Sequence, residues 1–104
     1  MNKEEAQFHA VGENIPEAAK GQLFGKPCYK LNGKAFCCFF KNEMVFKLTG
    51  EDHQEALSFD GAQLFDPSGK GRPMKEWVQL PYDYQEHWTR FAESAAEYLT
   101  QKNK

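Results

Sequence analysis

The segment from Gly25 to Leu48, GKPCYKLNGKAFCCFFKNEMVFKL, constrains the possible fold of this chain more than any other. Asn32-Gly33 is a strong signal for a two-residue type I′ turn, because both central residues of that turn need positive φ. A second tight turn is predicted at Lys41-Asn42, where the chemistry is weaker because lysine disfavours positive φ. The segment therefore predicts three antiparallel strands joined by two hairpin turns.

Side chains alternate across a sheet, so this prediction divides the segment into two faces. With two-residue turns, Cys28 lies opposite Cys37 and Tyr29 lies opposite Phe36. One face is almost entirely apolar and is expected to pack under helices; it consists of Cys28, Lys30, Ala35, Cys37, Phe39, Met44, Phe46 and Leu48. The second face is mixed but still aromatic, and it consists of Tyr29, Leu31, Phe36, Cys38, Phe40, Glu43, Val45 and Lys47.

The aromatic character of the second face predicts an interaction surface, because monomers seldom expose a contiguous apolar area. Its candidate residues are Tyr29, Phe36, Phe40, Val45 and Lys47. A second copy of the chain could cover them, since homodimers use self-complementary surfaces, and so could another protein. The alternative is cover by another segment of the same chain, such as the N-terminal helix.

Capping and turn residues predict the remaining elements. Asn2 is expected to cap a first helix with Glu5 at the partner position. The other expected elements are helices at Pro16–Lys20, at Glu51–Ser58 and after the cap Asp83, and strands at Gln22–Phe24, Ala62–Phe65 and Glu76–Leu80. A chain of 104 residues is expected to form one domain, residues 1–104. The element order predicts a two-layer α+β fold, an antiparallel sheet of about five strands with helices packed on one face.

Charge and composition narrow the classes of partner and compartment. The chain carries 13 basic and 15 acidic residues, a net charge of −2, whereas nucleic-acid binders usually carry a basic excess. The longest apolar run, Ala35 to Phe40, is far too short to span a bilayer, and the N-terminus lacks the apolar run of a signal peptide. Three cysteines, an odd number, fit free thiols better than a disulfide framework. These features predict a cytoplasmic protein with no membrane partner.

Candidate chemistry is sparse. Cys28 and Cys37, if directly opposed, lie within reach of a redox disulfide, although two small buried side chains are the simpler interpretation. The histidines His9, His53 and His87 fall on separate predicted helices and are expected at the solvated surface. No residue pattern indicates a catalytic, metal or cofactor site, so a role without catalysis is expected.

A basic loop, DPSGKGRP, offers another binding surface. Lys70, Arg72 and Lys75 are candidate contacts for an anion or a nucleic acid, although such a segment is more often a solvated turn. The loop lacks the spacing of a phosphate-binding P-loop. A small-molecule pocket between the sheet and the last helix, near Trp77 and Trp88, is a further alternative.

The strand segment FCCFFKNEMVFKL and the later GRPMKEWVQLP, followed by a capped, aromatic-rich helix, carry a family resemblance. The chain from about Gly21 to Leu99 resembles the small bacterial domains of the TfoX N-terminal type and the related YjbR-like proteins. The resemblance implies a two-layer α+β fold, a link to competence regulation and DNA binding among relatives, with no catalytic residues to carry over. Longer family members have a second, C-terminal domain, which this chain is expected to lack.

The sequence therefore favours a small non-catalytic domain that binds itself or a protein partner through the second sheet face. A nucleic-acid-associated regulator of transcription or competence is the alternative, and the net charge disfavours it. A small-molecule-binding domain is the third. No cofactor is expected in any of the three.

Overall fold

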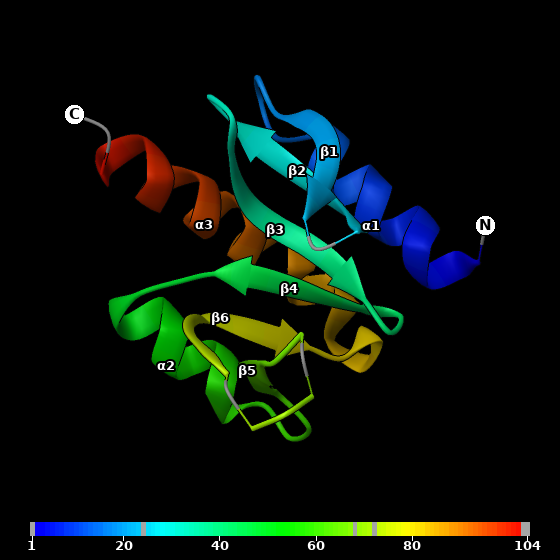
Figure 1. The fold of residues 1–104 in the computed structure, drawn as a ribbon, viewed down its shortest axis with the longest axis vertical. Coiled ribbons are helices and arrows are strands. Elements are labelled where there is room, and N and C mark those ends of the chain that lie inside the picture. The colour runs from blue at the N-terminus through cyan, green and yellow to red at the C-terminus, as the bar shows by residue number, and fades with distance from the viewer. Residues whose placement is uncertain (1, 24, 68, 72, 103–104) are drawn as a thin grey trace.

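The computed structural model describes residues 2–23, 25–67, 69–71 and 73–102 and shows a sheet with three helices packed on it (Figure 1). The elements in chain order are α1 (Lys3–Glu13), β1 (Ala19–Leu23), β2 (Lys26–Leu31), β3 (Lys34–Phe40), β4 (Glu43–Lys47), α2 (Gly50–Ser58), β5 (Gln63–Phe65), β6 (Met74–Leu80), the short 3-10 helix η1 (Tyr82–His87) and α3 (Trp88–Lys102). The sheet is antiparallel, with the strand order β1-β2-β3-β4-β6-β5. The predicted α+β fold is confirmed, with six strands instead of about five.

Both hairpin turns form where the sequence predicts them. Asn32 and Gly33 have φ of 53° and 80°, and Lys41 and Asn42 have φ of 51° and 65°. Positive φ at both positions is the signature of the type I′ turn, whose twist matches that of the flanking strands. Lys41 accepts this disfavoured backbone conformation because the pairing of β3 with β4 outweighs a single local preference.

The register between β2 and β3 differs from the predicted one. Cys28 pairs with Cys38 and Tyr29 with Cys37, whereas Lys30 pairs with Ala35. Phe36 is therefore an extra residue in β3, and the irregularity is a β-bulge. The predicted pairs Cys28–Cys37 and Tyr29–Phe36 are wrong, because an inserted residue shifts the pairing by one and exchanges the faces of every residue beyond it.

The bulge changes which side chains lie under the helices. The helix-covered core contains Phe8 and Val11 of α1, Ala56 of α2, and Trp88 and Phe91 of α3. On the sheet side it contains Tyr29, Leu31 and Phe36, which the sequence places on the second face, together with Cys37, Phe39, Met44, Phe46, Leu48, Val78 and Leu80. In exchange, Cys28, Lys30 and Ala35 lie on the opposite face, where the sequence does not expect them.

Two helix predictions need correction. Pro16–Lys20 does not form a helix: the chain turns through Glu17 at a φ of 67°, and β1 begins at Ala19 because it pairs with β2. The predicted strand Gln22–Phe24 overlaps the end of β1, and Phe24 lies outside the described residues. The final helix begins at Trp88 after a 3-10 turn, later than a cap at Asp83 implies.

The predicted cap of α1 is confirmed, since Asn2 Oδ1 accepts a hydrogen bond of 2.8 Å from the backbone N–H of Glu5.

Candidate functional site

The face of the sheet opposite the helices, called here the outer face, carries a second and smaller apolar cluster. Cys28, Cys38, Val45 and Phe65 are 0% exposed and Trp77 is 7% exposed. Around them lie four partly buried apolar residues, Leu23, Ala35, Phe40 and Met74. The outer face therefore has a closed centre with a partly exposed apolar rim, rather than the open aromatic surface that the sequence predicts.

Curvature of the sheet closes this centre without any helix. The rings of Phe40 in β3 and Phe65 in β5 have centroids 5.2 Å apart, although β4 and β6 lie between their strands. Neighbouring strands are about 4.8 Å apart, so three steps across a flat sheet would separate the two backbones by about 14 Å. The sheet therefore curls toward its outer face and brings the side chains of distant strands together.

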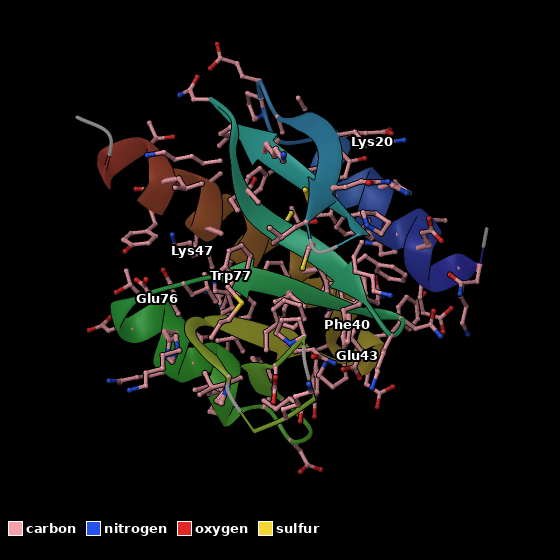
Figure 2. All side chains as sticks on the ribbon, in the orientation of Figure 1. Lys20, Phe40, Glu43, Lys47, Glu76 and Trp77 are labelled. Atoms are coloured by element: carbon pink, nitrogen blue, oxygen red, sulfur yellow. The ribbon has the colours of Figure 1, made fainter. Side chains whose placement is uncertain are left out.

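The five predicted interface residues divide between the two faces. Tyr29 and Phe36 are 2% and 0% exposed beneath the helices, so they form no part of an outer surface. Val45 lies on the outer face but is completely buried in its cluster. Phe40 and Lys47 remain partly accessible there, at opposite ends of β3 and β4 (Figure 2). The accessible part of the predicted surface is thus centred on Phe40.

Phe40 sits in a small charged environment. The ammonium groups of Lys26 and Lys41 lie 5.6 Å and 5.3 Å from its ring centroid, within cation–π range. Glu43 lies beside it (Figure 2), and its carboxylate accepts a hydrogen bond of 2.6 Å from the side-chain amide of Gln79. This end of the outer face therefore presents one aromatic ring with cations and a carboxylate at its edge.

The charge of the protein is strongly separated, which its net charge conceals. The stretch 19–47, which spans β1 to β4, contains only one acidic residue, Glu43, and six lysines: Lys20, Lys26, Lys30, Lys34, Lys41 and Lys47. The short helix α2 carries three acidic residues, two of which pair with Arg90 of α3. The net charge of the whole chain hides this separation, whereas a count over each predicted element reveals it.

The three cysteines are buried free thiols. Burial raises the pKa of Cys38 to about 12, with a further contribution from Cys28. Burial also raises the pKa of Cys28, against the lowering effect of Lys30, and raises that of Cys37 well above its ordinary value. Because the thiolate is the reactive form, all three are poor nucleophiles. The opposed pair is Cys28 and Cys38, not the predicted Cys28 and Cys37.

Alkaline pH is expected to destabilise the protein through these thiols. The folded state keeps the Cys38 proton up to a pKa of about 12, whereas an exposed thiol loses it near 9.0. The unfolded state then binds fewer protons above pH 9.0, so the free energy of unfolding falls as pH rises through this window. Replacing Cys38 with alanine is expected to make this fall shallower by up to about 1.4 kcal/mol per pH unit. Urea unfolding of both proteins, followed from neutral to alkaline pH, measures it; equal slopes would contradict the shielding of Cys38.

The basic loop between β5 and β6 binds its own carboxylate. Asp66 accepts hydrogen bonds of 3.0 Å and 2.9 Å from the backbone N–H groups of Gly69 and Gly71. These are the amides that a loosely bound anion would need, so the geometry disfavours an anion site in the loop backbone. Lys70 and Lys75 are exposed, and the third candidate contact, Arg72, lies outside the described residues.

His9 is held by neighbouring groups. His9 has a side chain only 12% exposed, so its predicted place at the solvated surface is wrong. Its Nδ1 lies 2.9 Å from the hydroxyl of Tyr29 and its Nε2 lies 3.4 Å from a carboxylate oxygen of Glu5. Burial, followed by Glu13, raises the pKa of Tyr29 to about 12, which keeps this hydroxyl protonated. These contacts anchor α1 on β2. The i, i+4 spacing of Glu5 and His9 is the sequence signal for the contact between those two residues.

The predicted small-molecule pocket has no geometric basis at the two tryptophans. Trp77 belongs to the outer cluster and Trp88 to the helix-covered core, so the sheet separates them. The described residues enclose no detectable pocket and contain no group of three or more histidine, cysteine or acidic side chains arranged for a metal ion. None of the described helices has the length and apolar character needed to cross a membrane.

Comparison of the chain with protein-family models, with curated proteins and with solved structures found no match. The resemblance to TfoX N-terminal and YjbR-like domains therefore stays a prediction.

Proposed function

We propose that this protein is a non-catalytic cytoplasmic binding domain that binds itself or a protein partner through the outer face, with Phe40 at the centre of the contact. The observation that carries the proposal is the partly exposed ring of Phe40, next to other partly exposed apolar residues, on a sheet face that no helix covers. Protein interfaces bury an apolar centre within a polar rim, and these partly exposed apolar residues would supply that centre. The three free thiols favour a reducing compartment.

Self-association is the form of binding that the charges around Phe40 favour. Lys26 and Lys41 stand over the ring and Glu43 lies at the same end of the sheet. A two-fold axis near Phe40 would place the carboxylate of each copy against the ammonium groups of the other, which is how a self-complementary surface works. The apolar ring would then be desolvated at the centre, where interface residues contribute most.

The substitution Phe40→Glu tests this surface. Sedimentation velocity over a range of protein concentrations is expected to show a reversible dimer for the unchanged protein and a monomer for Phe40→Glu. Each copy would bury a second carboxylate beside Glu43 at the axis, and the two copies would bring four carboxylates together. Phe40→Leu is the matched control, since it keeps an apolar side chain and is expected to keep the dimer. An unchanged protein that sediments as a monomer up to about 1 mM, a concentration that would reveal even weak binding, would rule out self-association.

A further inference from the structure

We propose that the edge strand β1 is a docking site for an extended acidic segment of a partner protein, which adds to the sheet as a seventh strand. This inference rests on the proposed function in its broad form, protein binding, and uses a different surface from the one around Phe40. Strand addition gives affinity through backbone hydrogen bonds and specificity through alternate side chains. Both the backbone and the charges of β1 meet these requirements.

The backbone of β1 is open along one side. β1 is the terminal strand of the sheet, with β2 as its only partner among the described strands. Its residues Ala19, Lys20 and Gln22 are exposed, and the other two are only partly buried. The described part of the chain places no strand along this edge, so a peptide can reach it without displacing anything in the sheet.

Pairing with Pro27 indicates which backbone groups point outward. Antiparallel residues alternate between hydrogen-bonded and non-hydrogen-bonded pairs. Gln22 pairs with Pro27, which has no N–H, and this favours the non-hydrogen-bonded type for that pair. Lys20 has the same parity, so the N–H and C=O groups of Lys20 and Gln22 point away from β2 and toward an incoming strand.

The side chains around this edge are basic. Lys20 is an exposed residue of β1 itself (Figure 2). Lys30 of β2 crosses β1 over Gly21: a Cβ on that glycine would lie 3.0 Å from Lys30 Cε and 3.6 Å from Lys30 Nζ. The missing side chain of Gly21 thus lets the ammonium of Lys30 reach toward the free edge. Neither lysine forms an ion pair with any described residue.

The complementary occupant is therefore an extended segment with glutamate or aspartate at alternate positions. Residues of one parity on such a segment would meet Lys30 on the outer face, and residues of the other parity would meet Lys20 on the opposite face, since side chains alternate along a strand. Exposed charges of this kind attract the partner and set its register more than they add affinity. The affinity would come mainly from the backbone.

Protein is favoured over single-stranded nucleic acid as the occupant because the rings needed for base stacking are covered. Tyr29, Phe36 and Trp77 are 2%, 0% and 7% exposed, whereas nonspecific single-strand binding combines a basic surface with accessible aromatic rings. Phe40 is more accessible, but two ammonium groups already lie over its ring. An unpaired strand edge, in contrast, offers nothing specific to a nucleic acid.

Fluorescence anisotropy of a labelled peptide of about ten residues, long enough to pair with a short strand, tests the proposal. The probe alternates glutamate and threonine and has blocked termini. It is expected to bind at low salt and to weaken as salt increases, while a lysine–threonine peptide of equal length, which is repelled by Lys20 and Lys30, binds at least tenfold more weakly. Failure of the glutamate peptide to bind at low salt would overturn the proposal.

Gln22→Pro and Gln22→Ala form a matched pair for the backbone contribution. Proline removes the outward N–H of residue 22, which does not take part in pairing with β2, and alanine keeps it. The proline variant is expected to bind the peptide at least tenfold more weakly than the alanine variant. Equal affinities in two folded variants would show that the edge is not used. Should Gln22→Pro fail to fold, the same glutamate peptide with alternate N-methyl groups tests the unchanged protein, with the same tenfold loss expected and equal affinity contradicting strand addition.

Charge reversal locates the side-chain contribution. The double variant Lys20→Glu, Lys30→Glu is expected to lose at least tenfold in affinity for the peptide, whereas Lys75→Glu, an exposed lysine on β6, leaves it unchanged. A loss confined to Lys75→Glu would move the site to β6, next to the basic loop, and overturn the proposal. Binding of an oligothymidine of similar charge more tightly than the peptide, with no effect of Gln22→Pro, would assign the basic strands to nucleic acid instead.

The outcomes for the two surfaces are separable. Phe40→Glu is expected to abolish self-association. At physiological salt, where charges more than about 8 Å apart are largely screened, it is expected to leave peptide binding within a factor of about three. A protein that dimerises through Phe40 but does not bind the peptide would overturn only the edge-strand inference. A monomeric protein that binds the peptide would overturn only self-association.

Discussion

The substitution Phe36→Glu is expected to abolish the folded state, whereas Phe40→Glu is expected to leave it intact. Phe36 is 0% exposed in the core beneath the helices. Replacing a buried phenylalanine with a small residue costs about 3–5 kcal/mol, and an unpaired buried carboxylate adds several kcal/mol more. The total is comparable to the entire stability of a small domain, about 5–15 kcal/mol. The partly exposed rim position of Phe40 lets a carboxylate there remain hydrated.

Circular dichroism and thermal unfolding of the two variants measure this difference directly. Phe36→Glu is expected to lack a cooperative unfolding transition. Phe40→Glu is expected to unfold cooperatively, at a temperature near that of the unchanged protein. Phe36→Leu is the control for loss of the ring alone and is expected to stay folded, with a loss of about 1.5 kcal/mol or less. A cooperatively folded Phe36→Glu would mean that β2 and β3 pair in the simple hairpin register, with no bulge.

Gly12→Ala is expected to destabilise the protein although it lies within a helix. In an exposed helix this change is stabilising by about 1 kcal/mol. Here an added Cβ would lie 2.3 Å from Cδ2 of the buried Tyr29 ring, too close for any real contact. Overpacking of this kind costs about 1–3 kcal/mol or more. Since the ring is enclosed between α1 and β2, the net result is expected to be a clear loss of stability.

A double-mutant cycle separates this clash from other effects of the alanine. Tyr29→Ala alone is expected to be strongly destabilising, because it removes a buried ring and its contact with His9. In that background, Gly12→Ala is expected to become neutral or stabilising, and urea unfolding of the four proteins gives the coupling. Additive effects of the two substitutions would show that Tyr29 does not press against Gly12.

One residue, Phe36, explains why the sequence pattern assigns the side chains of β2 to the wrong faces of the sheet. The hairpin rule correctly located the Asn32-Gly33 turn, and it assumed that pairing continues residue by residue away from the turn. Phe36 interrupts that pairing, and local sequence contains no signal for it, since phenylalanine is as acceptable in a regular strand as at a bulge. Three aromatic or aliphatic side chains, Tyr29, Leu31 and Phe36, gain burial under the helices in this way, which favours the bulged register over the regular one.

The functional surfaces were harder to predict than the fold for a related reason. The burial of Val45 and the partial exposure of Phe40 depend on which distant side chains meet on the outer face. The position of Lys30 over Gly21 depends on the bulge that places Lys30 on that face. Curvature is a property of the whole sheet, in which β5 approaches β3 across two intervening strands. In a strand without a bulge, a pattern of alternating residues specifies which side chains share a face, but it does not specify what covers that face.

The sequence by itself determined the α+β class, the two hairpin turns, the cap at Asn2 and the buried state expected of the cysteines. The turns and the cap depend on neighbours within a few residues along the chain, and the class and the cysteine burial follow from the order of the elements and from residue type. Only the tertiary structure decided the register of β2 against β3, the closure of the outer face and the open edge at β1. Those features depend on contacts between segments that are distant in sequence, where burial of the Tyr29 and Phe36 rings outweighs the local pairing preference.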